Sequence, residues 1–358
     1  MASTVEPDGI NCASEKPLGL LRERGFKLGY RPVLDGLRCV AILLVLFFHG
    51  ARGKMPGGWV GVEIFFVLSG FLITTLLLLE IQKRGRIDLK KFYIRRALRL
   101  FPALYSMLFL AFLTSFFLVE NRDTFLGEIM AAGLHVWNYG PELGFWEFGA
   151  PTRISHTWSL STEEQFYLVW PFFLSLLVAL RSRAWLSVGV LTALYLALPG
   201  YQVIILGCML AIVFPSSMPK KMATPVAVLA ISSTLFLLYV AFFGPEKTFL
   251  VKLFCGSASC VLIYFLIFFP GSLAARLLTH RIPIYVGRIS YGLYLWHVPV
   301  NKLLYHFWGK VPAAYHVPVF FTKIAVAFLV AGLSYKFIEE PFLKKKAKYS
   351  TRESGEKR

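Results

Sequence analysis

Long apolar segments follow one another through most of this chain, and they constrain its fold more than any other feature. Polar or basic stretches separate these segments from residue 33 to residue 338. A helix needs roughly 20 apolar residues to cross a bilayer, and a chain inside lipid must satisfy its own backbone hydrogen bonds. The sequence therefore predicts an all-α polytopic membrane protein. Crossing helices are expected over 33–50, 58–79, 97–119, 158–180, 184–198, 201–214, 225–243, 249–269, 284–307 and 315–338.

The composition agrees with this class of protein. Hydrophobic residues make up 56% of the 358 residues, only 16% are charged, and the mean hydropathy is +0.61. A soluble domain of this size needs more polar surface. The net charge of +18 would also suit nucleic-acid binding, but the basic residues lie between apolar runs and at the ends, as in cytoplasmic loops. We therefore expect membrane lipids rather than nucleic acid as partners. The five cysteines have no metal-ligand spacing, and no metal site is expected.

The basic residues also predict the orientation. The segment 83–99 carries eight lysines and arginines and is expected to be cytoplasmic. If the apolar stretch 125–139 does not cross, the later basic loops also fall on the cytoplasmic side. We therefore predict about ten crossing helices, both termini in the cytoplasm, and a re-entrant or interfacial segment at 125–139. The expected parts are a disordered cytoplasmic tail at 1–31, a transmembrane domain at 32–342 and a basic cytoplasmic tail at 343–358.

Four basic residues within or beside the apolar runs are candidates for chemistry, because ionisable groups in a membrane are costly. Arg38 and His49 lie eleven residues apart in the first run. That is about three helical turns, so both share one face, roughly 16 Å apart along the axis. Arg96 and Arg99 begin the third run on one helix face. Arginine binds phosphate through bidentate hydrogen bonds, so Arg38, Arg96 and Arg99 predict an anion site. Charge that only sets the topology is the alternative.

Other polar residues are expected nearer the far side of the membrane. Glu63 is predicted near the level of His49, either as a functional group or as a hydrated interfacial carboxylate. The paired acids that open the fourth run are expected to line a cleft for a polar acceptor, although acids also favour the start of any helix. His297 is either a cavity residue or a packing histidine. The substrate-binding candidates are Asp35, His156, Trp158, Ser159, Glu163, Glu164 and His297.

Six stretches in order resemble the acyltransferase-3 family of integral membrane acyltransferases, which includes O-acetyltransferases of O-antigen and exopolysaccharide. They are residues 35–49, 63–71, 92–102, 156–167, 290–299 and 337–342. The resemblance runs from about residue 31 to residue 342. It places the family's essential arginine–ten residues–histidine pattern on Arg38 and His49, and its R-x-x-R motif on Arg96 and Arg99. It implies an acyl-CoA donor, foremost acetyl-CoA, and a core of ten spans.

The residues and the resemblance together predict a transmembrane O-acyltransferase of the bacterial plasma membrane. Arg38, Arg96 and Arg99 would hold the CoA phosphates at the cytoplasmic face. His49 would deprotonate a hydroxyl of an exported or surface glycan, or would itself be transiently acylated. Glu63 is the second catalytic candidate; it, Glu163 or Glu164 would orient the imidazole or bind the acceptor.

Two other classes of function and one partner stay open at this point. A transporter or flippase of glycan precursors is the main alternative, because polar residues inside a bundle also mark permeation paths. A membrane scaffold or receptor is the other, but it would not need buried charges in six motifs. Some members of the family carry a fused extracytoplasmic esterase-like domain, so an extracytoplasmic partner protein is a further possibility.

Overall fold

The computed structural model describes residues 29–50, 53–119, 122–140, 142, 144, 154–179, 184–198, 200–215, 217–309, 312–346 and 349. Within these residues the chain is helical and has no strand. The long helices are α1 (Pro32–Gly50), α2 (Val60–Arg84), α3 (Leu89–Leu118), α5 (Thr157–Ala179), α8 (Ala223–Phe243), α9 (Phe249–Phe268), α12 (Ser290–Trp308) and α13 (His316–Ser334). Most residues of the two predicted tails lie outside the described residues.

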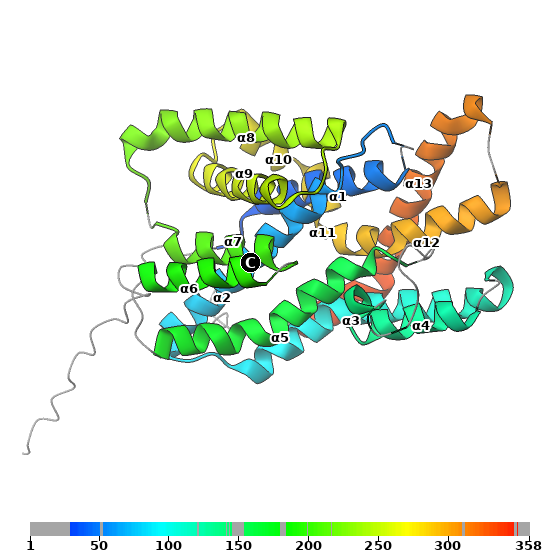
Figure 1. Cartoon of the computed structure of the whole chain (residues 1–358), viewed down its shortest axis with the longest axis horizontal. Coiled ribbons are helices and arrows are strands. Elements are labelled where there is room, and N and C mark those ends of the chain that lie inside the picture. Colours follow the sequence, from blue (N-terminus) through cyan, green and yellow to red (C-terminus); the bar gives the residue numbers. More distant parts are fainter. Residues whose placement is uncertain are drawn as a thin grey trace, which may run out of the picture.

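Shorter helices connect and flank these long ones. They are α4 (Arg122–Gly133), α6 (Ala184–Ala197), α7 (Gln202–Val213), α10 (Leu273–Leu278), α11 (Arg281–Arg288) and α14 (Glu340–Lys346), with single 3-10 turns between some of them. Figure 1 shows α8 along one edge of the molecule and α3, α4 and α5 along the opposite edge. Between these edges, α1 contacts α2, α9, α10, α11, α12 and α13. The helix that carries Arg38 and His49 is therefore the central one.

Six helices are long and apolar enough to cross a membrane. They are α1, α2, α3, α8, α9 and the continuous helix from His316 to Lys345. The apolar helices α6 and α7 are shorter, whereas α5 and α12 have the length but are less apolar than those six. The prediction of an all-helical integral membrane protein is confirmed. Length and apolarity alone support fewer crossings than the expected ten.

Two predicted boundaries were wrong. The segment 284–307 is not one helix, because the chain breaks at Ile289 between α11 and α12. A Cβ atom on Gly287 would lie 1.8 Å from the Asp35 carbonyl oxygen, so α11 packs directly against the backbone of α1. The third helix starts at residue 89 rather than 97, because the Asp88 carboxylate accepts a hydrogen bond from Lys91 N at 3.0 Å and caps it.

Glycines bring α2 and α7 into backbone contact. A Cβ atom on Gly70 would lie 2.0 Å from the Ile204 carbonyl oxygen, and one on Gly207 would lie 2.2 Å from that of Val67. Such close approach is how helices pack where lipid offers no hydrophobic driving force between them. It holds α2, which lines both cavities described below, in a single position.

The replacement Gly207→Val is therefore expected to destabilise the protein. Two packed backbones would have to separate to admit the side chain, and overpacking typically costs about 1–3 kcal/mol. The midpoint of thermal unfolding in detergent should fall by several degrees. The matched control is Gly189→Val on α6, where an added Cβ meets nothing within 4 Å. Equal midpoints for the two variants would contradict this account of the contact.

Candidate functional site

One cavity of about 70 Å³ brings the three predicted arginines together. Arg38 comes from α1, and Arg96 and Arg99 come from α3. Its other walls are Val62, Phe65, Phe66, Ser69, Leu100, Ser159, Leu160, Glu163, Tyr167, Ser290, Tyr291 and Tyr294. We call this the arginine cavity. Its charged groups are three guanidinium donors and one carboxylate, Glu163, so positive charge is in excess, which favours an anionic ligand.

The three arginines differ in how well they are paired. The Arg96 guanidinium lies 3.1 Å from a Glu164 carboxylate oxygen and 3.4 Å from the centroid of the Tyr167 ring. Neither Arg38 nor Arg99 has a hydrogen-bonded or ion-paired acceptor in the part of the chain that the structure describes, and Arg38 Nε is buried without a partner. Buried donors without acceptors are costly, so these two residues are the ones that a bound anion would satisfy.

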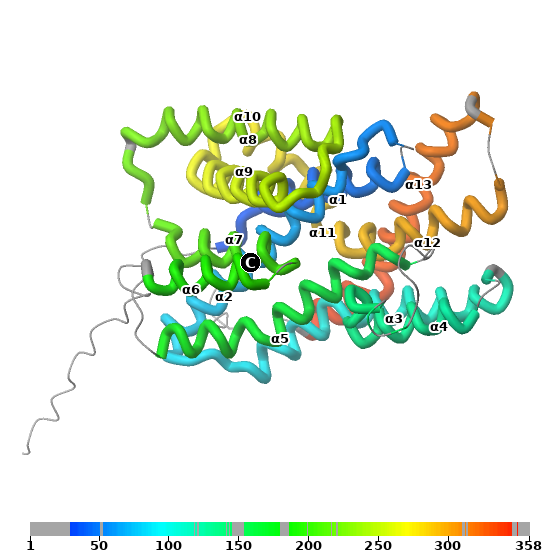
Figure 2. The backbone as a smooth tube through the Cα atoms, viewed as in Figure 1, coloured from blue at the N-terminus to red at the C-terminus, as the bar shows by residue number. Residues whose placement is uncertain are grey.

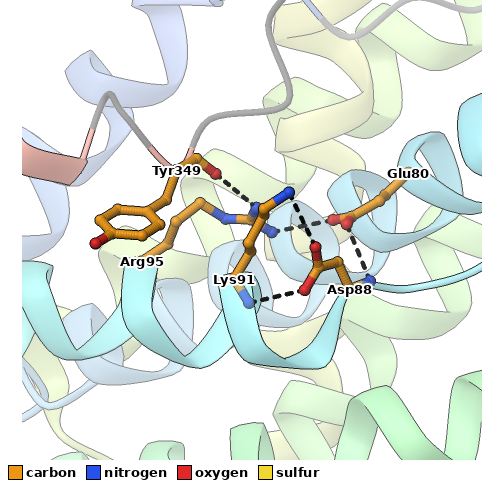
Figure 3. A network of polar contacts seen from close by, with 5 residues as sticks. All are labelled: Glu80, Asp88, Lys91, Arg95 and Tyr349. Atoms are coloured by element: carbon orange, nitrogen blue, oxygen red, sulfur yellow. Dashed lines mark hydrogen bonds and ion pairs between the residues drawn. The ribbon is translucent and has the colours of Figure 1, made fainter.

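Arg95, one residue before Arg96, lies outside this cavity. Its guanidinium lies 3.0 Å from a Glu80 carboxylate oxygen and also donates to the Tyr349 carbonyl (Figure 3). This network also includes the Asp88 cap at the start of α3. Arg95 therefore anchors the helix, while the two arginines that follow face the cavity.

Glu163 lines the arginine cavity and Glu164 pairs with Arg96, whereas neither lines the cavity around His49, where an acceptor was expected. Helices α3 and α5 run close together (Figure 2), and Glu164 pairs with Arg96 between them. The Glu163 carboxylate accepts hydrogen bonds from the hydroxyls of Ser69 and Tyr167. Glu163 follows His156 by seven residues, which is about 10 Å of helix. Both acids therefore lie near the level of the arginines rather than near His156.

Three histidines meet at the other end of α1. The rings of His49 and His297 have centroids 4.9 Å apart, and those of His156 and His297 are 5.2 Å apart. His156 is 2% exposed and His297 is 1% exposed, whereas His49 remains accessible. His49 comes from α1, His297 from α12, and His156 from the turn that precedes α5. The His49 ring is therefore the one placed to meet a ligand.

Hydrogen bonds to backbone carbonyls indicate which ring nitrogen of His49 and of His297 carries hydrogen. A carbonyl oxygen only accepts, so a ring nitrogen beside it must be the donor. His297 Nδ1 lies 2.7 Å from the Tyr294 carbonyl oxygen, and His49 Nδ1 lies 3.1 Å from that of Val45. With both rings neutral, the one Nδ1 hydrogen of His49 is shared between the Val45 carbonyl and His297 Nε2, which lies 3.3 Å from His49 Nδ1. His49 Nε2 is then left unprotonated, as a base requires.

A second cavity, of about 140 Å³, surrounds His49. Its walls are Val45, Phe48, His49, Trp59, Val62, Trp137, Ser155, His156, Trp158, Lys247 and Tyr294. We call this the histidine cavity. Val62 and Tyr294 line both cavities, so the two adjoin. At this junction the Tyr294 hydroxyl donates to the His156 carbonyl at 2.8 Å and shares a 2.5 Å hydrogen bond with Ser159. The arrangement places the cavity that holds the three arginines next to the cavity that holds His49.

Two of the predicted site residues, Glu63 and Asp35, line neither cavity. Glu63 is 6% exposed and is not among the residues that line the histidine cavity; it interacts electrostatically with Lys247 and Lys252 instead. The Asp35 carboxylate accepts a 2.7 Å hydrogen bond from the Tyr30 hydroxyl and lines neither cavity. Asp35 therefore belongs to the packing of α1 rather than to the cavities.

Sequence analysis missed several lining residues. Tyr294 had a signal, since it precedes His297 by three residues on the same helix face. Trp137 and Lys247 had none, because each lies in a connection between helices that only the fold brings to His49.

Desolvation lowers the pKa of Lys247, and Lys252 lowers it further, while Glu63 opposes this shift. Among the described residues, no group of three His, Cys, Asp or Glu side chains is placed to hold a metal ion.

Comparison with known proteins supports the assignment that these motifs suggested. The profile of the acyltransferase domain matches residues 31–335. The chain belongs to the acyltransferase-3 family. It is 32% identical to the peptidoglycan O-acetyltransferase OatA of Listeria monocytogenes and 29% identical to the O-acetyltransferase OatA of Staphylococcus aureus. These alignments cover 88% and 90% of this chain, but only 56% and 59% of those proteins. No solved structure matches the chain.

Proposed function

We propose that this acyltransferase-3 protein is an O-acetyltransferase that transfers the acetyl group of cytoplasmic acetyl-CoA to a hydroxyl of a surface glycan. The observation that carries the proposal is the junction of the arginine cavity with the histidine cavity at Val62 and Tyr294. Arg38 and Arg99 would bind CoA phosphates at one end, and His49 would meet the acceptor at the other. The unpartnered Arg38 Nε fits this role.

The orientation follows from the same proposal. With both termini in the cytoplasm, α1 starts at the cytoplasmic face and ends beyond the bilayer centre. The axial rise from Arg38 to His49 is about 16 Å, which suits the extended pantetheine arm of CoA. About ten segments would cross the bacterial inner membrane, and α4, at 12 residues, would enter without crossing. The peptidoglycan named for the Listeria relative makes a cell-wall glycan the first acceptor to test.

The chemistry requires a base at the acceptor hydroxyl and cationic side chains that hold the CoA phosphates. His49 Nε2 removes the proton of the acceptor hydroxyl as that oxygen attacks the thioester carbonyl carbon. The carbon–sulfur bond then breaks, and the CoA thiolate takes the proton from the imidazolium. In the two-step alternative, His49 first takes the acetyl group and then passes it to the acceptor. In either route His297 positions the imidazole, because its Nε2 accepts the hydrogen bond from His49 Nδ1.

The proposal is tested by mass spectrometry of the host's surface glycans. Wild-type cells, a deletion strain and the deletion strain carrying His49→Ala are compared. We expect both mutant strains to lose one acetyl unit, 42 Da, per modified site, as the chemistry of acetyl transfer requires. A transporter or flippase predicts another result: the deletion removes the whole glycan from the surface, and His49→Ala restores the wild-type pattern.

Replacement of His297 separates positioning from binding. His297→Leu removes the acceptor for His49 Nδ1, so we expect kcat to fall about 10- to 100-fold, as is typical for groups that orient a functional imidazole. The KM for acetyl-CoA should stay unchanged, because the arginines are untouched. His297→Gln should retain more activity, since its amide oxygen can accept the same hydrogen bond. If the glutamine variant is no better than leucine, the hydrogen bond has no such role.

A further inference from the structure

Aromatic rings form much of the wall around His49. Trp59, Trp137, Trp158 and Tyr294 all line the histidine cavity, and Trp59 and Trp158 belong to segments far apart in the chain. Large flat rings offer broad apolar faces together with a polar edge. The C–H faces of a sugar ring pack against such surfaces, while its hydroxyls remain free for hydrogen bonds. The wall therefore suits the glycan acceptor of the proposed function, on which this inference rests.

Lys247 adds a charge to that wall, and the backbone holds it there. Helix α8 ends at Gly244, whose φ of +57° turns the chain into the connection that carries Lys247. Gly57, in the connection before α2, donates a 3.1 Å hydrogen bond to the Ala241 carbonyl, and a Cβ on Gly57 would lie 1.6 Å from the Val240 oxygen. The connection before α2 is thus packed against the last turn of α8, and a Cβ on Gly244 would lie 2.7 Å from the Pro56 side chain, so the start of the connection that carries Lys247 lies against it as well.

The side chain of Lys247 is held by rings rather than by a carboxylate. Its Nζ lies 5.4 Å from the centroid of the Trp59 ring and 5.6 Å from that of Phe48, within cation–π range. Among the described residues no carboxylate lies within 4.0 Å of Lys247, and the lining of the histidine cavity includes no acidic residue. The acid that acts on it electrostatically, Glu63, is buried and is not among the residues that line the cavity. The cation is free to bind a ligand.

We propose that the histidine cavity selects an acceptor sugar that carries a carboxylate, and that Lys247 binds this carboxylate. A cation beside a cavity without acidic residues favours an anionic ligand over a neutral one of the same shape. The charge contributes to binding of the acceptor and not to the transfer step, because His49 and its partner His297 supply the base. Lys247 is therefore a specificity-determining residue on the acceptor side.

The test uses the full chain in proteoliposomes with acetyl-CoA and two matched acceptors. One is a hexosamine disaccharide with an ether-linked lactyl carboxylate, and the other is the same disaccharide with that carboxylate as its primary amide. For the wild type we expect a KM about tenfold lower for the acid, the effect of one hydrogen bond to a charged group. Lys247→Met should abolish this preference by raising the KM for the acid, with kcat and the KM for the amide within about twofold of wild type.

Two further variants make the result specific. Lys247→Arg keeps the charge and should keep the preference for the acid. Lys252→Met removes a nearby cation that does not line the cavity, and should also keep it. The inference is overturned if Lys247→Met leaves the preference intact, or if it lowers kcat equally for both acceptors, which would indicate a role in the transfer step. If the wild type acetylates neither acceptor while retaining CoA binding, the glycan acceptor of the proposed function fails along with it.

Discussion

Replacement of His49 by alanine is expected to reduce acyl transfer at least about a hundredfold, the usual contribution of a positioned general base. The ring is the accessible member of the three-histidine group, and its Nε2 is the nitrogen left free to accept a proton. Because the side chain lines a cavity and is not packed in the core, its loss should leave the protein folded and inserted. The measurement is the rate of acetyl transfer from acetyl-CoA by the purified protein in liposomes.

A matched control tests whether this loss is specific to the position. His306 lies on α12 near the end of the same bundle and lines neither cavity. His306→Ala should therefore retain wild-type transfer. Thermal unfolding of both variants in detergent checks that the folded state survives. Full activity of His49→Ala would exclude both the general-base and the acyl-enzyme route.

Removal of the unpaired arginines has the second large expected effect. Arg38→Met and Arg99→Met should each raise the KM for acetyl-CoA about 10- to 100-fold, because a charge-assisted hydrogen bond contributes roughly 1.5–3 kcal/mol. Methionine keeps much of the apolar stem and removes the donors. Neither arginine has an acceptor in the described part of the chain, so little native pairing is lost with it. Donor binding is measured both as KM and by calorimetry with CoA.

The neighbouring arginines provide the controls for donor binding. Arg95→Met breaks the ion pair with Glu80 (Figure 3) and should leave the KM for acetyl-CoA unchanged, because Arg95 does not line the arginine cavity. Arg96→Met is expected to act differently from Arg99→Met, since it also leaves the Glu164 carboxylate without its partner and should lower stability. Equal KM values for the Arg95 and Arg99 variants would place the donor elsewhere.

Much of the helix pattern follows from the sequence. Apolar length predicted the positions of α1, α2, α8 and α9 to within a few residues, because a buried or lipid-facing helix must be apolar along its length. It did not predict the break at Ile289, two residues after Gly287, where α11 lies against the backbone of α1. Nor are α5 and α12 among the six helices apolar enough to cross, since both carry polar residues that line the cavities.

The same division holds for the candidate site. The spacing of Arg38 and His49 on one helix, and of Arg96 and Arg99 on another, depends only on the 3.6-residue repeat, so the sequence by itself determined that each pair shares a face. Which helices pack together depends on side-chain and backbone contacts between distant segments. Only the tertiary structure therefore decided that α3 brings its arginines to α1, that Glu163 joins them, that His297 lies within hydrogen-bond distance of His49, and that Lys247 reaches the histidine cavity.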